Sequence, residues 1–373
     1  MIIKREKLYW VFCVCFTTYW FIHYLLQNLS CDLSFFKNTF LIIGVFCFFL
    51  EWLYTKFTFK EYLIQAIFLL FLGYVYVKSG MNNEGILTFF PAIIGLKNID
   101  IKKSIKVIFK TLLILEIIVI IGTILGIIPS TYYIKTDKFG NSYSIFEMAM
   151  MHGNPNYIVI FNLVVMYIYI YYEKINIKRC LILQLILLVA YFVFYCKTGI
   201  ILGSLAIWGT LVIKKVSKRI YNYKIVTFLF GHSYAIFYAF VYILAKYMYD
   251  TKIFELINKV VQSRIYEAYY YITNIGVGLL PKQVNYYYIC DNSQTVLLVN
   301  FGLIFTLIYI YIHDKAIRNL LKKGLYIEVF IMCLYLLYSY SETTFIKPFS
   351  NFSAIFLIYV FYKNGNDLND KKK

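Results

Sequence analysis

The chain has 373 residues, of which 61% are hydrophobic and 15% charged, and its mean hydropathy is +0.68. Soluble domains of this length carry a smaller apolar share, so the composition excludes an ordinary soluble fold and indicates a polytopic membrane protein. The net charge of +18 would suit a nucleic-acid-binding protein, but the positions of the charges, described below, account for it without nucleic acid. The eight cysteines lie mostly in or beside apolar runs and form no CxxC motif or His/Cys cluster, so we expect no metal site.

Apolar runs that suit membrane spans recur along the chain. Residues 107–128 alone exceed the roughly 20 residues that a spanning helix needs. The first run follows LysArgGluLys without a cleavable-signal pattern, so we expect it to be retained as a span. The runs at 85–96, 199–213 and 350–362 are short, and are candidates for re-entrant segments or for merging with a neighbour. The apolar runs lie at 8–26, 39–53, 61–77, 85–96, 107–128, 157–172, 180–196, 199–213, 225–248, 295–312, 325–341 and 350–362.

The loops between these runs differ in their content of lysine and arginine. With the N-terminus in the cytoplasm, the cytoplasmic segments hold 25 of the 37 Lys and Arg residues and the outer segments hold 11, with Lys110 inside a span. This distribution obeys the positive-inside rule. We therefore predict an all-α polytopic membrane protein of about 12 transmembrane helices, with both termini cytoplasmic and one integral membrane domain over residues 1–373. Its long extracytoplasmic loops would span about 129–156 and 249–294, the second being large and helical.

Arg264 is the one arginine of five that this topology places outside. Residues 253–272, treated as a helix, put Arg264 inside an apolar arc of about 140° that also holds Ile265 and Ala268, while Glu267 falls on the opposite, polar side. Snorkelling to lipid head groups is one explanation for an arginine in that arc. Because the planar fork of arginine suits phosphate and pyrophosphate, we favour an anion site facing the membrane helices.

The segment 289–295 (IleCysAspAsnSerGlnThr) closes the same loop directly before a new span. Asp291 therefore lies near the membrane surface, where it could act as a base or orient an acceptor hydroxyl. A polar helix cap at the membrane boundary is the alternative role for this motif. Asn292 follows as a candidate substrate-binding residue.

The other long outer loop ends with HisGlyAsnProAsn at 152–156. His152 is a candidate catalytic residue in a loop dense with Gly, Asn and Pro. Asn154 and Asn156 are candidate substrate-binding residues. The alternative is a structural turn that ends in an asparagine helix cap.

Two further charged residues stand out near or within apolar runs. Lys197 lies in the short connection Cys196–Lys197–Thr198–Gly199, where it could provide a counter-charge for phosphate or anchor the ends of two spans. Glu116 lies in the middle of the run at 107–128, where an acid is costly and is a functional candidate by default. We expect Glu116 to be paired internally.

In this order, these motifs resemble those of the Wzy-type polymerases of surface polysaccharides, within the O-antigen ligase and polymerase superfamily. The resemblance covers about residues 140–345. The residues that carry it are HisGlyAsnProAsn (152–156), LysThrGly (197–199), SerArgIle and the following Gly-rich segment (263–278), AspAsnSer (291–293) running into LeuLeuValAsnPheGlyLeu (297–303), and SerGluThr (341–343).

The resemblance implies a fold like that of the C-type, multi-spanning glycosyltransferases, in a bacterial plasma membrane. It implies transfer of a growing glycan from undecaprenyl diphosphate to the next lipid-linked repeat unit at the outer face, without a metal, nucleotide sugar or other cofactor. By position, Arg264 would bind the diphosphate, and Asp291, with His152 as a further catalytic residue, would accept the acceptor proton. Lys197, Asn154, Asn156 and Asn292 would bind substrate. The implied partners are the lipid-linked oligosaccharides and the bilayer, with a chain-length regulator and a flippase as candidate protein partners.

This chain departs from the family pattern at three of these positions. Lys197 stands where relatives commonly have arginine, which removes the bidentate geometry of a guanidinium. Asp291 stands where related ligases have histidine. Gly153 and Asn154 are inserted between His152 and Pro155, where many relatives read HisProAsn.

Two alternatives to a polymerase stay open at this point. A ligase that hands finished glycan to another acceptor belongs to the same class and carries the same motifs. A lipid-linked oligosaccharide flippase or other transporter would explain the spans and Glu116. A flippase is expected to place charged residues along a central cavity, whereas the candidates here are concentrated in outer loops, and the chain shows no internal repeat.

Overall fold

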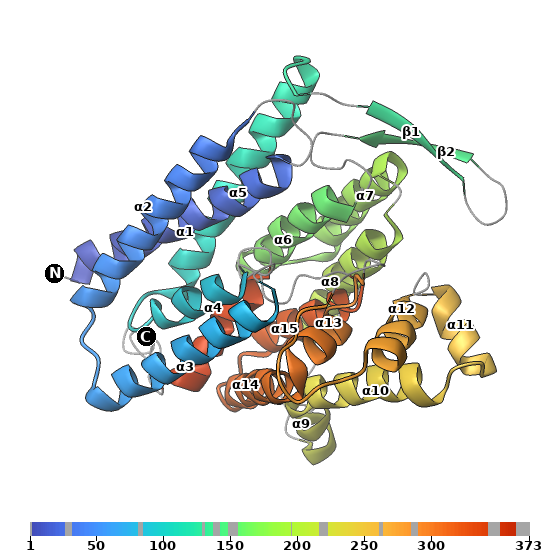
Figure 1. Cartoon of the computed structure of the whole chain (residues 1–373). Helices are drawn as coiled ribbons and strands as arrows, with labels where there is room; N and C mark the ends of the chain where they lie inside the picture. Colours follow the sequence, from blue (N-terminus) through green and yellow to red (C-terminus); the bar gives the residue numbers. More distant parts are fainter. Residues whose placement is uncertain are drawn as a thin grey trace. The chain divides into compact units, whose positions relative to one another are not determined.

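The computed structural model describes residues 2–26, 32–80, 85–128, 131–136, 142–147, 156–194, 196–215, 223–260, 264–284, 290–341 and 351–362. These residues are mainly helical, with one two-stranded sheet, and the predicted helical class is confirmed (Figure 1). Contacts divide the chain into two compact units: unit 1 holds the described residues of 1–56 and 98–215, and unit 2 those of 57–97 and 216–367. The single membrane domain over 1–373 stays a prediction.

Unit 1 is built from six helices and a hairpin within its described part. Helix α1 packs against α2 and α5, and α8 packs against α6 and α7. α1 and α6 are the inner helices, since Phe12 and Tyr167 are buried, whereas α2, α5 and α7 keep exposed apolar faces of the kind that lipid-facing helices carry. The elements are α1 (Ile2–Leu26), α2 (Ser34–Tyr54), α5 (Ile101–Ile124), β1 (Thr131–Thr136), β2 (Ser142–Glu147), α6 (Asn156–Tyr172), α7 (Ile177–Phe194) and α8 (Lys197–Lys215).

The hairpin occupies part of the loop predicted at about 129–156. β1 and β2 pair antiparallel, with Thr131 opposite Glu147 and Thr136 opposite Ser142. The prediction contained no strands in this loop. The segment ThrTyrTyrIleLysThr is rich in the β-branched and aromatic residues that favour strands, which is the local signal that was missed.

Unit 2 is arranged around one long central helix, α14. His313, Ala316 and Ile317 on α14 are buried, and the helix contacts α9, α10, α13, α15 and α16. The elements are α3 (Phe59–Lys78), α4 (Gly85–Ile94), α9 (Lys224–Gly231), α10 (Ser233–Tyr247), α11 (Lys252–Val260), α12 (Arg264–Tyr270), a π-helical turn (Tyr271–Ile275), α13 (Ser293–Asn300), α14 (Gly302–Lys322), α15 (Tyr326–Tyr338), a 3-10 helix (Phe352–Leu357) and α16 (Ile358–Phe361).

Five helices of the described residues are long and apolar enough to cross a membrane: α2, α3, α5, α7 and α8. A sixth candidate is the pair α9 and α10, which bends by 64° at His232. These helices fit a membrane-embedded protein, as the composition predicts.

The predicted count of about 12 spans is not confirmed, because several apolar runs form short or broken helices. The run at 85–96 is the ten-residue α4, and the run at 350–362 is a 3-10 helix followed by the four-residue α16. The run at 295–312 is broken at Phe301 into α13 and α14. By contrast, the run at 199–213 is part of the 19-residue α8, which is long enough to span.

Candidate functional site

The candidate site of unit 2 is built on the short helices that follow α10. Residues 253–272, expected to form one amphipathic helix, form α11 and then α12, which runs into the π-helical turn; residues 261–263 lie outside the described residues. The apolar side of α12 packs against α10 and buries Ile265 and Ala268, as the periodicity predicts. This packing holds the polar residues of α12 in a defined place beside the chain segment that leads into α13.

Arg264, Glu267 and Asp291 form one ion-paired group, which we call the Arg264 cluster. Arg264 Nη1 donates to Glu267 Oε1 at 2.8 Å, and Arg264 Nη2 lies 2.6 Å from Asp291 Oδ2. The second oxygen of Glu267, Oε2, accepts from the backbone N–H of Asp291 at 3.4 Å. The arginine therefore binds two carboxylates, and the cluster joins α12 to the start of α13.

The Arg264 cluster is largely buried but remains partly accessible to solvent. The side chain of Arg264 is 17% exposed, and those of Glu267 and Asp291 are each 21% exposed. Burial raises the pKa of Glu267 above its usual value, Arg264 opposes that shift, and the neighbouring charge of Asp291 adds to it. The surroundings of Glu267 thus favour its protonated form.

The chain after Asp291 is held firmly in place. Asn292 caps α13, because its Oδ1 accepts from the backbone N–H of Thr295 at 3.0 Å. The backbone N–H of Ser293 donates to the Ser339 carbonyl at 2.9 Å, and Gln294 Nε2 donates to Ser339 Oγ at 2.6 Å. These bonds fix the start of α13 to the end of α15, and so fix the position of Asp291 next to them.

Tyr340 lies next to the Arg264 cluster and was not singled out from the sequence. Its hydroxyl is buried, and no described group hydrogen-bonds to it. Burial raises the pKa of the neighbouring Cys290 thiol to about 12, so this cysteine is neutral and unreactive near pH 7.

Tyrosine rings on α12 and on the turn before α11 form a partly exposed surface. Tyr249 stacks on Tyr269 with ring centroids 3.7 Å apart and an interplanar angle of 7°, and Tyr266 lies 6.3 Å from Tyr269. Tyr266 is 48% exposed, and its backbone N–H donates to Asn258 Oδ1 at 3.2 Å. Flat rings with a polar edge are suited to the apolar faces of sugars.

The structure brings together three of the residues predicted for the site: Arg264, Asp291 and Asn292. Lys197 is the exposed first residue of α8, and Asn156 is the first residue of α6, both in unit 1. His152 and Asn154 lie outside the described residues.

Glu267 is the cluster residue that sequence reasoning missed. The helical wheel placed it on the polar side of the predicted helix, away from Arg264. Its position three residues after Arg264 was the available signal, because residues at that spacing are neighbours on a helix surface and opposite charges there attract.

Within the described ranges, no group of three or more His, Cys, Asp or Glu side chains could hold a metal ion. No protein-family model, curated protein or solved structure matches this chain.

Proposed function

We propose that the chain is a membrane-embedded glycosyltransferase that joins undecaprenyl-diphosphate-linked oligosaccharide repeat units into a surface polysaccharide. The proposal rests on the Arg264 cluster, in which a cation suited to diphosphate lies within hydrogen-bonding distance of two carboxylates, one of which, Asp291, is suited to proton transfer. The order of the sequence motifs, which include Arg264 and Asp291, also supports it. In this proposal the reaction takes place at the outer face of a bacterial plasma membrane, and the chain crosses about 12 times with both termini cytoplasmic.

The proposed reaction is a displacement at the anomeric carbon of the donor glycan. The hydroxyl oxygen of the acceptor forms a new C–O bond to that carbon, and the bond between the carbon and the diphosphate oxygen breaks. The hydroxyl proton passes to the carboxylate of Asp291, and the electron pair leaves with the lipid diphosphate. Arg264 stabilises the charge that develops on the leaving diphosphate.

The pairing of Arg264 with Asp291 couples these two steps. When Asp291 takes the acceptor proton, it loses its charge and its attraction for Arg264 weakens. The positive charge of Arg264 then acts on the diphosphate at the moment when negative charge develops there. Glu267 stays hydrogen-bonded to the guanidinium during the proposed reaction, so we assign it a positioning role.

The remaining site residues belong to the proposal as substrate contacts. Lys197, Asn154 and Asn156 would bind the lipid-linked substrate, with His152 as a further catalytic residue. Asn292 uses its Oδ1 to cap α13, so its proposed substrate contact is through Nδ2, which is buried and bonded by no described group. A chain-length regulator and a flippase are the proposed protein partners.

The test is the glycan ladder of a strain that lacks this gene, complemented with the wild-type chain or with Arg264→Ala. We expect Arg264→Ala to slow polymerisation by about 10²–10³-fold, since it removes a charge that stabilises the leaving group. Arg264→Lys should also slow polymerisation, because lysine lacks the planar set of N–H donors with which arginine binds two partners at once. Arg179→Ala is the matched control, since Arg179 makes one exposed pair with Glu173 at 2.8 Å outside the site.

Immunoblots of the membrane fraction check that all variants are inserted equally. Single repeat units that accumulate at the outer face in the Arg264→Ala strain would support a polymerase. Lipid-linked units trapped at the cytoplasmic face would instead indicate a flippase, and normal polymers that stay unattached to their final acceptor would indicate a ligase.

Asp291→Asn separates proton transfer from binding. An asparagine keeps the shape and a hydrogen bond but accepts no proton, so we expect the transfer rate to fall by about 10²-fold or more while donor binding changes little. The measurement is the transfer rate and the donor affinity of the purified chain. Equal loss of both would show that Asp291 does not act as a base.

A further inference from the structure

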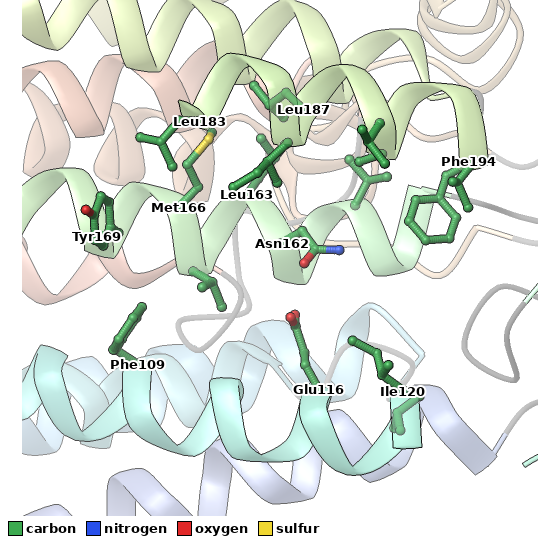
Figure 2. A pocket seen from close by; sticks show the side chains of 17 residues that line it. Phe109, Glu116, Ile120, Asn162, Leu163, Met166, Tyr169, Leu183, Leu187 and Phe194 are labelled. Carbon is green, nitrogen blue, oxygen red and sulfur yellow. The ribbon is translucent and has the colours of Figure 1, made fainter. Parts of the chain in front are cut away.

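Unit 1 contains a cavity of about 540 Å³ between α5, α6 and α7. Figure 2 shows its lining, with Phe109 on α5, Leu163 and Met166 on α6, and Leu187 and Phe194 on α7. The volume lies in the range of sites that bind small molecules. Nearly all of the lining is apolar, so the cavity suits a hydrocarbon chain.

Glu116 is the charged residue of this lining. Its side chain extends from α5 into the cavity, and Asn162 reaches into the same space from α6 (Figure 2). Glu116 is only 9% exposed, and no described group hydrogen-bonds to its buried Oε1 atom. The expectation of an internal partner for Glu116 is therefore wrong for Oε1 within the described part of the chain. A buried carboxyl oxygen without a partner is unfavourable, so this position suits a ligand that donates a hydrogen bond to it.

One side of the cavity borders the outer surface of unit 1. Ile120, Ile186 and Val189 line the cavity and are also 41%, 59% and 57% exposed. They lie on α5 and α7, which are both long and apolar enough to span a membrane. A molecule that enters on this side comes from the hydrocarbon of the bilayer and must itself be largely apolar.

We propose that this cavity binds a membrane amphiphile, with its hydrocarbon chain against the apolar lining and a hydrogen-bond-donating head group on Glu116. The head group is a hydroxyl or an ammonium, because either donates to a carboxyl oxygen and Asn162 offers a second polar contact. A phosphate-bearing head group does not fit, since a buried phosphate would leave most of its oxygens without hydrogen-bond donors in this largely apolar lining. The site is therefore distinct from the diphosphate site of the proposed reaction and does not depend on that proposal.

The test uses the purified full-length chain in phosphatidylcholine nanodiscs. Dodecyl alcohol and dodecylamine, each carrying a photoreactive diazirine, are added, and the labelled peptides are located by mass spectrometry. In the wild-type chain we expect label from one or both probes to concentrate on the cavity segments of α5, α6 and α7. Uniform labelling of all lipid-facing helices, including α2, would overturn the proposal.

Two pairs of variants test the two parts of the site. Ala190→Trp places a large side chain in the cavity and should remove the concentrated label. Leu181 lies on the same helix outside the cavity lining and its side chain is 57% exposed, so Leu181→Trp should leave the label unchanged. Glu116→Leu should weaken labelling by roughly tenfold, the equivalent of one hydrogen bond. Labelling that survives both Ala190→Trp and Glu116→Leu would refute the site.

Glu116→Gln identifies the head group without altering the shape of the cavity. Its amide oxygen still accepts from a hydroxyl but carries no charge to pair with an ammonium. If the alcohol labels the cavity of the wild-type chain more strongly than the amine and still labels Glu116→Gln, the ligand carries a hydroxyl. If the amine labels the wild-type chain more strongly and its label is lost in Glu116→Gln, the ligand carries an ammonium. If both probes label Glu116→Gln and Glu116→Leu as strongly as the wild-type chain, Glu116 does not bind the head group.

Discussion

Arg264 binds two carboxylates that are 24 residues apart in the chain. The guanidinium can do this because its donors lie in a rigid plane and reach Glu267 and Asp291 in different directions. Such a pairing has two effects. It fixes the loop helix α12 relative to the start of α13, and it keeps a cation and a proton acceptor adjacent, which the proposed reaction requires.

At the same scale, Glu267→Gln should change how stability depends on pH. Burial raises the pKa of Glu267 above its usual value of 4.5. The folded chain therefore binds the carboxyl proton of Glu267 more tightly than the unfolded chain does. The wild-type chain therefore loses stability as pH rises from about the usual value through the raised pKa. Glutamine does not titrate, so the variant should lack this part of the decline.

The measurement for Glu267→Gln is thermal unfolding in detergent from about pH 4 to about pH 8, with the difference between wild type and variant plotted against pH. Glu173→Gln is the control, since Glu173 pairs with Arg179 in an exposed position. A difference that stays constant over this range would contradict the raised pKa.

The broken helix pair of unit 2 is stabilised by a neighbouring helix. At the bend between α9 and α10, Arg318 of α14 donates to the carbonyl of Gly231 at 2.9 Å. Asp314 of α14 accepts from the backbone N–H groups of Tyr234 at 3.0 Å and Ala235 at 3.3 Å. A cation thus binds the C-terminal end of α9 and a carboxylate binds the N-terminal end of α10, as the helix dipoles favour.

Asp314→Asn tests this arrangement at the level of the helix pair. Asparagine has one acceptor oxygen and no charge, so one of the two backbone donors loses its partner and we expect a loss of about 1 kcal/mol in the free energy of unfolding. Asp250→Asn is the matched control, because Asp250 is exposed and its φ of 63° is tolerated by asparagine. Equal destabilisation of the two variants, measured by chemical denaturation in detergent, would refute the capping role.

The break between α13 and α14 depends on Gly302. Its φ is +80°, and an added Cβ would lie 2.6 Å from the carbonyl carbon of Leu280, so neither the backbone conformation nor the space suits another residue. The segment before α13 runs alongside this break, since Leu303 N–H donates to the Gly278 carbonyl at 2.9 Å and Ile304 N–H to the Leu279 carbonyl at 3.2 Å.

Gly302→Ala should therefore destabilise the chain by more than the backbone effect alone, which is about 1 kcal/mol. Gly126→Ala is the control for that effect, because Gly126 has a φ of +70° and nothing within 4 Å of an added Cβ. Thermal unfolding of both variants gives the comparison. If Gly302→Ala costs no more than Gly126→Ala, close contact with Leu280 does not constrain the break.

At the scale of the whole molecule, the helices fit a membrane protein and the loop charges give its proposed orientation. Five helices, or six with the bent pair, have the length and hydropathy of spans among the described residues. The proposed count of about 12 requires that shorter helices such as α4 and α15 also lie within the bilayer. Neighbouring parts of the protein would then have to hydrogen-bond the unpaired backbone groups at the ends of these helices.

Cysteine labelling of intact cells tests the orientation. Lys252→Cys, at the start of α11, should react with a membrane-impermeant maleimide added outside, and Lys102→Cys, at the start of α5, should react only after permeabilisation; both lysines are exposed. The wild-type chain measures the background of its own cysteines. Labelling of Lys102→Cys in intact cells would overturn the proposed orientation.

The sequence by itself determined the helical class, the approximate positions of the helices and the buried side of α12. Composition and periodicity are local properties, so they predicted the burial of Ile265 and Ala268 without knowledge of their neighbours. Only the tertiary structure decided which residues meet. The pairing of Arg264 with Asp291, the break at Gly302 and the exposure of Glu116 to a cavity each depend on contacts between separate elements. Such contacts arise from packing in three dimensions, which the spacing of residues along one chain does not specify.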